Sequence, residues 1–169
     1  MRRAIREAGP GLLIPLAWVV VGAAHRGVVS ARSVFIAHFV MVAFMAFFLT
    51  TGWNEMTDRV LQGWRAIIVV GLAITALGAV GFLMPAAATP LWALSLGGWM
   101  LLPAVGLAYT GILLPEATRI YIGSATITFV GAVGYGVAAV GDIELLALAG
   151  IAAVGIGQTI GILDAIARY

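Results

Sequence analysis

The chain contains two histidines, and they are the residues whose types and spacing could do chemistry. His38 lies inside an apolar stretch, and Met41 and Met45 fall on its face if that stretch is helical. An ionisable side chain within a membrane span is costly to bury, so it is a functional candidate. His25 closes the preceding apolar stretch beside Arg26, where an interfacial role is the simpler interpretation. The short segment between the two stretches would allow the histidines to approach each other.

Two cofactors suit His38. An imidazole with thioether sulfurs favours Cu(I), because soft ligands select it, and His38 with Met41 would be the metal ligands. An imidazole on a membrane helix also suits haem b, for which His25, a methionine such as Met41 or Met45, or His38 of a second copy would be the further ligand. In the alternative interpretation the imidazole bonds a backbone carbonyl and the methionines only pack. The residues leave both interpretations open.

The elements that must position these side chains are membrane helices. Hydrophobic residues make up 63% of the chain and charged residues 9%, whereas a soluble domain carries about 25% charge. Six apolar stretches are continuous and near the ~20 residues of a spanning helix, without the alternation of barrel strands. We therefore expect an all-α fold, a single domain over residues 1–169 with six transmembrane helices. The expected spans are 12–24, 34–51, 66–84, 91–114, 120–140 and 144–166.

The arginines predict the orientation. With both termini in the cytoplasm, seven arginines lie inside and Arg26 and Arg32 lie outside, as the positive-inside rule requires. The chain is then a multi-pass protein of the cytoplasmic membrane, and His38 lies near the outer face. Aromatic residues near the span ends are expected to be interface anchors. They are Trp53, Trp64, Trp92 and Tyr121.

Several polar residues lie within or near the later spans. Gln158, Tyr109 and Thr110 could line a polar path or join helices. Asp164 is expected to pair with Arg168 one turn later. Pro103, in the middle of the fourth span, predicts a kink. A candidate internal repeat relates Thr50, Glu55 and Arg59 to Thr110, Glu116 and Arg119.

Absent residue types exclude other chemistry. Without cysteine the chain cannot form disulfides, thiolate metal sites, iron–sulfur clusters or covalent c-type haem. All nine basic residues are arginine, so no lysine Schiff base can form. The net charge of +2 is too small and dispersed for a nucleic-acid partner. Motifs for nucleotide binding, serine catalysis and zinc hydrolysis are missing, so no catalytic residue is assigned and the expectation leans away from an enzyme.

Two segments resemble a known family. They are Ala37-His38-Phe39-Val40-Met41 with Phe44, Phe47-Phe48 and Gly52-Trp53-Asn54, and Leu96-Gly97-Gly98-Trp99 with Gly106-Leu107-Ala108-Tyr109 and Leu114-Pro115. The first resembles the second helix of haem–copper oxidase catalytic subunits, and the second resembles helices of that superfamily and of related membrane proteins. The resemblance implies that His38 is an axial haem ligand. Six spans replace twelve and the copper-site histidines have no counterparts, so the resemblance implies haem binding or a shared packing style, without oxygen reduction.

Three functions follow. The first is a haem- or copper-binding bundle centred on His38, for electron transfer, sensing or metal handling. The second is a channel or transporter for a small neutral solute, using the kinked fourth span and Gln158. The third is a structural or lipid-sensing bundle, or an accessory subunit, without chemistry of its own. The expected partners are the lipid bilayer and either further copies of the chain or a larger membrane complex.

Overall fold

The computed structural model describes residues 2–168, and this part of the chain is all-helical, as the apolar pattern predicted. The α-helices are α1 (Arg2–His25), α2 (Ala31–Gly52), α3 (Arg59–Gly81), α4 (Ala88–Leu113), α5 (Thr118–Gly141) and α6 (Glu144–Arg168). Two 3-10 turns, η1 (Pro85–Ala87) and η2 (Pro115–Ala117), precede α4 and α5. Helices α2 to α6 are long and apolar enough to cross a membrane, η1 and η2 extending two of them, and Gly11–His25 is a further apolar segment, in α1.

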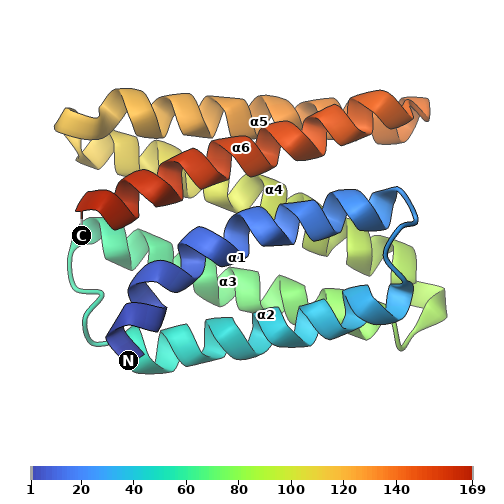
Figure 1. The fold of residues 1–169 in the computed structure, drawn as a ribbon, viewed down its shortest axis with the longest axis horizontal. Helices are drawn as coiled ribbons and strands as arrows, with labels where there is room; N and C mark the ends of the chain where they lie inside the picture. Colours follow the sequence, from blue (N-terminus) through green and yellow to red (C-terminus); the bar gives the residue numbers. More distant parts are fainter. Residues whose placement is uncertain (1, 169) are drawn as a thin grey trace.

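The helices form a bundle in which α3, α4 and α5 each pack beside the next helix of the chain (Figure 1). Helix α2 packs mainly against α3, and α1 packs mainly against α6. Near its start α1 meets α2, where Gly9 faces the ring of Phe44, and from there it crosses toward α6. The N- and C-termini lie at the same end of the bundle (Figure 1).

Capping side chains set where two helices begin. The Ser30 hydroxyl accepts a hydrogen bond from the backbone N–H of Ser33 (3.2 Å) and caps α2, which starts three residues before the expected span. The Asp58 carboxylate accepts from the N–H of Leu61 (2.9 Å), so α3 begins at Arg59, well before the apolar stretch at residue 66. The expectation based on hydropathy alone missed this polar first turn, since a cap does not depend on apolar residues.

Glycines bring α5 and α6 into backbone contact. A Cβ added to Gly131 would lie 2.7 Å from the carbonyl oxygen of Gly150, and one added to Gly150 would lie 2.7 Å from that of Gly131. Two turns along, Gly157 rests against the backbone of Ser124. Such close approach gives helices dispersion contacts in lipid, where no hydrophobic drive exists between them. Gly123, on the same helix, has no neighbour within 4 Å of an added Cβ.

We expect Gly131→Ala to destabilise the bundle by about 1–3 kcal/mol, because its methyl group would meet backbone atoms that cannot move aside. Gly123→Ala is the matched control and should change the free energy of unfolding by less than about 0.5 kcal/mol. Unfolding of purified protein by SDS in mixed micelles measures both. Equal effects of the two substitutions would contradict the backbone contact.

Candidate functional site: hydrogen bonds between the helices

The imidazole of His38 is turned toward its own helix. Its Nδ1 lies 2.8 Å from the carbonyl oxygen of Val34, and because a carbonyl only accepts, Nδ1 carries the proton. This bond turns the ring toward the N-terminal end of α2, as is usual for helical side chains. The ring edge also packs on Phe82 of α3, with the ring centroids 5.4 Å apart. The remaining nitrogen, Nε2, faces α3 and α4.

The surroundings of His38 Nε2 do not fit a haem. A Cβ added to Gly78 would lie 2.8 Å from Nε2 and 2.7 Å from the Ser95 hydroxyl oxygen. The α3 backbone therefore stands directly in front of this nitrogen. An axial ligand needs the iron and the plane of the porphyrin in that position, so α3 would have to move away to admit the group. In this arrangement Gly78 gives His38 a contact surface and no open coordination position.

Among the described residues, no hydrogen bond or ring contact joins His38 to the other proposed ligands. Met41 and Met45 lie on α2 toward its C-terminal end, whereas the His38 ring turns toward the N-terminal end. His25 is exposed, and its ring packs against Tyr135 of α5 (5.8 Å between centroids). The described residues contain no group of three or more His, Asp or Glu side chains placed to hold a metal ion. A cofactor at these residues stays a prediction.

Gln158 joins three helices. Its Nε2 donates to the backbone carbonyl oxygen of Trp99 on α4 (2.9 Å), and its Oε1 accepts from the indole Nε1 of Trp18 on α1 (2.9 Å). The Trp99 carbonyl lies four residues before Pro103, which has no N–H to offer it. Gln158 therefore supplies from α6 the hydrogen bond that the proline removes from α4. Gln158 is 5% exposed, and both of its hydrogen bonds join α6 to another helix.

Two tryptophan–threonine pairs join α3 and α4. The indole Nε1 of Trp99 donates to Thr75 Oγ1 (2.8 Å), and the indole Nε1 of Trp64 donates to Thr110 Oγ1 (3.0 Å). Each threonine hydroxyl then donates to a glycine carbonyl four residues earlier in its own helix, at 2.7 Å for Thr75 and 2.8 Å for Thr110. Each pair thus has one bond from tryptophan to threonine and one from threonine to glycine. In one pair the tryptophan lies on α3, and in the other it lies on α4.

An internal repeat underlies these pairs. The matching residues are Gly63-Trp64, Val70-Gly71-Leu72-Ala73 and Thr75 in α3, and Gly98-Trp99, Val105-Gly106-Leu107-Ala108 and Thr110 in α4. The contacts repeat too, because the Trp99 ring lies on Gly71 and the Trp64 ring lies on Gly106. Since the two helices are antiparallel neighbours, equal residues that contact each other's helix define a local pseudo-two-fold axis. We call this arrangement the α3–α4 clasp.

The repeated residues of the clasp can be seen in the sequence, but the internal repeat that we expected from the sequence lies in other segments. That comparison aligned loop residues such as Glu55 and Glu116, whereas the repeat lies inside the helices. Two expected interface anchors also have another role. Tyr121 is only 1% exposed and belongs to the core, and the Trp64 indole is bonded to Thr110. The anchor expectation is wrong for Tyr121, since position near a span end does not show which way a helix face points.

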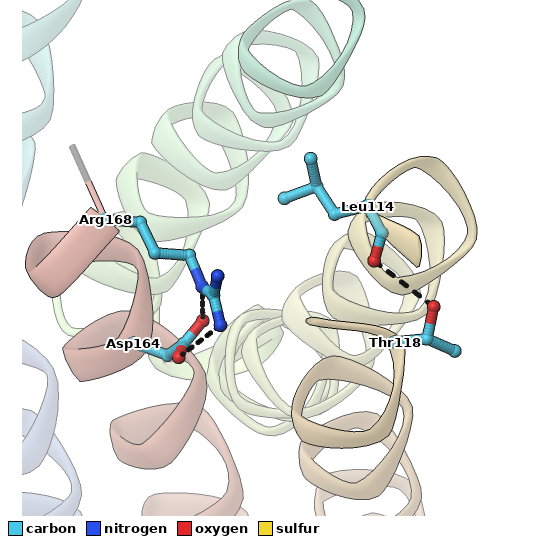
Figure 2. Close-up of polar contacts among 4 residues, drawn as sticks. All are labelled: Leu114, Thr118, Asp164 and Arg168. Atoms are coloured by element: carbon cyan, nitrogen blue, oxygen red, sulfur yellow. Dashed lines mark hydrogen bonds and ion pairs between the residues drawn. The ribbon is translucent and has the colours of Figure 1, made fainter. Parts of the chain in front are cut away.

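At the end of α6 the predicted ion pair is confirmed. Arg168 Nε lies 2.6 Å and Nη2 lies 3.2 Å from the two carboxylate oxygens of Asp164, and the guanidinium points toward the turn between α4 and α5 (Figure 2). In that turn the Thr118 hydroxyl donates to the carbonyl of Leu114 (3.2 Å). Tyr109 is partly exposed, and its ring covers Gly63 of α3. These contacts belong to helix packing at this end of the bundle.

Double-mutant cycles test the clasp. With Trp64→Phe and Thr110→Val, and separately with Trp99→Phe and Thr75→Val, we expect coupling energies of about 0.6 kcal/mol and at most about 1.7 kcal/mol. The two cycles should agree within about 0.5 kcal/mol, because the bonds are equivalent. A cycle between Trp64 and Thr75, which are not bonded, is the control and should give no coupling. Coupling in one pair alone would refute the symmetric arrangement.

Comparison of the chain with models of known protein families, with curated proteins and with solved structures finds no match. The helix contacts described above are therefore the basis for assigning a role. They bring together Gln158, Thr110 and four tryptophan or threonine partners, and they do not bring together the two histidines.

Proposed function

We propose that this chain is a structural membrane bundle that serves as an accessory subunit of a larger complex in the cytoplasmic membrane. In this proposal all six helices cross the bilayer and both termini lie in the cytoplasm. The observation that carries it is the use of the interior polar side chains. Gln158, Thr75 and Thr110 are buried, and their hydrogen bonds join helices.

The same bonds favour a structural role over a solute path. A path for a neutral solute needs polar groups that can exchange their partners for the solute. The Gln158 amide is held on both sides, and Thr128 on α5 donates to the Ser124 carbonyl (2.8 Å). Among the described residues the buried Ser124 hydroxyl has no hydrogen-bond partner, but it lies at the tight contact between α5 and α6 near Gly157. The centre of the α3–α4 clasp is filled by indole rings lying on glycines.

Helix α2 supports the accessory role. Among the five long apolar helices it has the highest mean hydropathy and the smallest buried share. Its exposed side chains include Ile36, Phe39 and Val40, which are large and apolar. A helix packed mainly on one neighbour leaves most of its surface for lipid or for another membrane protein. We take that surface as the contact with the complex.

The purified protein is expected to show no Soret band and no stoichiometric copper, because the α3 backbone at Gly78 stands in front of His38 Nε2. Visible spectroscopy and elemental analysis of protein expressed with added haem precursor or copper give the answer. The comparison variants are His38→Ala and His25→Ala. A Soret band or bound copper that is lost in His38→Ala but kept in His25→Ala would establish a cofactor site and overturn the structural proposal.

Extraction of native membranes with a mild detergent should yield the chain in a particle larger than the bundle alone. Phe39→Ala on α2 should shift the chain to the smaller particle, since it removes a large contact side chain. Phe129→Ala on α5 is the matched control, because both phenylalanines are 54% exposed and only the first lies on α2. Native gel electrophoresis with detection of the chain measures the distribution.

Two outcomes would contradict the accessory role. One is migration of the wild-type chain from native membranes as a lone bundle. The other is flux of glycerol or urea into liposomes that contain only the purified protein, above that of empty liposomes. The flux result would favour the channel or transporter function instead.

A further inference from the structure

The hydrogen bonds from Trp18 through Gln158 to the Trp99 carbonyl link the first helix of the chain to the proline in the fourth. We propose that they form a conformational latch, in which docking of α1 holds α4 closed at Pro103 and release of α1 lets α4 open there. The latch comprises Trp18, Gln158, Trp99 and Pro103. It is independent of the role proposed above, because it concerns how the helices move relative to one another.

Pro103 is the hinge of the latch. A proline inside a helix leaves the carbonyl four residues earlier without its N–H partner and is the usual place for a kink. In an apolar interior an unpaired carbonyl costs several kcal/mol, since no water is present to replace the missing bond. Here Gln158 supplies the partner, and α4 runs unbroken from Ala88 to Leu113. The closed form of α4 therefore depends on the position of one side chain of α6.

Helix α1 fixes that side chain. The Trp18 indole donates to Gln158 Oε1 and thereby determines which way the amide faces, leaving Nε2 directed at α4. Trp18 is itself seated on Gly155 of α6, where a Cβ would come within 2.9 Å of the Trp18 Cβ. When α1 leaves, Oε1 loses its donor and the amide is free to rotate. The Trp99 carbonyl then loses its partner for part of the time.

Helix α1 has one main neighbour in the bundle. It packs mainly against α6, with smaller contacts to α2 and, through His25, to Tyr135 of α5. At its C-terminal end it is joined to α6 by an ion pair between Arg26 and Glu144 (3.4 Å). Those two side chains are 59% and 68% exposed, and exposed ion pairs contribute little. Trp18 and Gln158 thus form a buried polar link between the described parts of α1 and α6.

The chain has no cysteine, so a single cysteine can report on the hinge. Ala104 adjoins Pro103 and is 6% exposed, and Ala104→Cys in the full chain should react slowly with a membrane-permeant maleimide. Adding Trp18→Phe should raise the labelling rate about threefold, which corresponds to the average membrane hydrogen bond of about 0.6 kcal/mol. Trp64→Phe is the matched control. It breaks an equivalent bond to α4 outside the latch and should leave the rate unchanged.

Pro103→Ala gives a second, more specific test. Alanine restores an N–H at position 103, so the Trp99 carbonyl gains a partner in its own helix. In this background Trp18→Phe should no longer raise the labelling rate at position 104. Amide hydrogen exchange of residues 99–107 gives the same comparison without the cysteine, if Ala104→Cys fails to fold. An equal effect of Trp18→Phe in both backgrounds, or an equal effect of Trp64→Phe, would overturn the latch.

Discussion

The structure depends on the requirement that backbone polar groups in a bilayer find their hydrogen-bond partners within the protein. Lipid tails are as apolar as leucine, so burying apolar residues does not hold helices together in the membrane. What remains is close contact between backbones and hydrogen bonds between helices. This chain uses both, with glycines joining α5 to α6 and indole or amide bonds joining α1, α3, α4 and α6.

Tryptophan suits the packing of helices in lipid because one side chain can make both a close contact and a hydrogen bond. Its ring covers a glycine of the neighbouring helix, while its N–H reaches a hydroxyl one turn further along. In the α3–α4 clasp the repeated sequence places this combination at both ends of the helix pair. A shift of one helix along the other would break both bonds and lift both rings from their glycines. The clasp therefore fixes the register of the pair as well as its separation.

The helices themselves could be predicted from the sequence, because continuous apolar runs of this length have few alternatives. The first turn of α3 could not be predicted from hydropathy, since it is polar and begins at the Asp58 cap. From Pro103 alone one can infer that the Trp99 carbonyl needs a donor. That Gln158 provides it could not be inferred, because the two residues lie on different helices and only packing brings them together. The repeat in α3 and α4 is present in the sequence, but it is hard to recognise because most helices of this chain have similar apolar residues.

His38 shows the opposite difficulty. Its rarity and its methionine neighbours pointed to a ligand, and helical periodicity placed all three on one face. Periodicity does not say which way along the helix a ring turns, and here the ring turns toward the Val34 carbonyl. Nor does it identify what stands in front of the ring, which here is the backbone at Gly78. The sequence therefore showed that His38 could act as a ligand, whereas only the structure showed which groups surround its ring.

The bond between Trp18 and Gln158 connects residues 140 positions apart in the sequence. During synthesis α1 emerges from the ribosome before α2 to α5, whereas its main partner, α6, emerges after them. The nascent chain must therefore carry α1 without its final neighbour, while α3 and α4 can already pair as a hairpin. Among these six helices, the one made before the others is thus the last to meet its main neighbour.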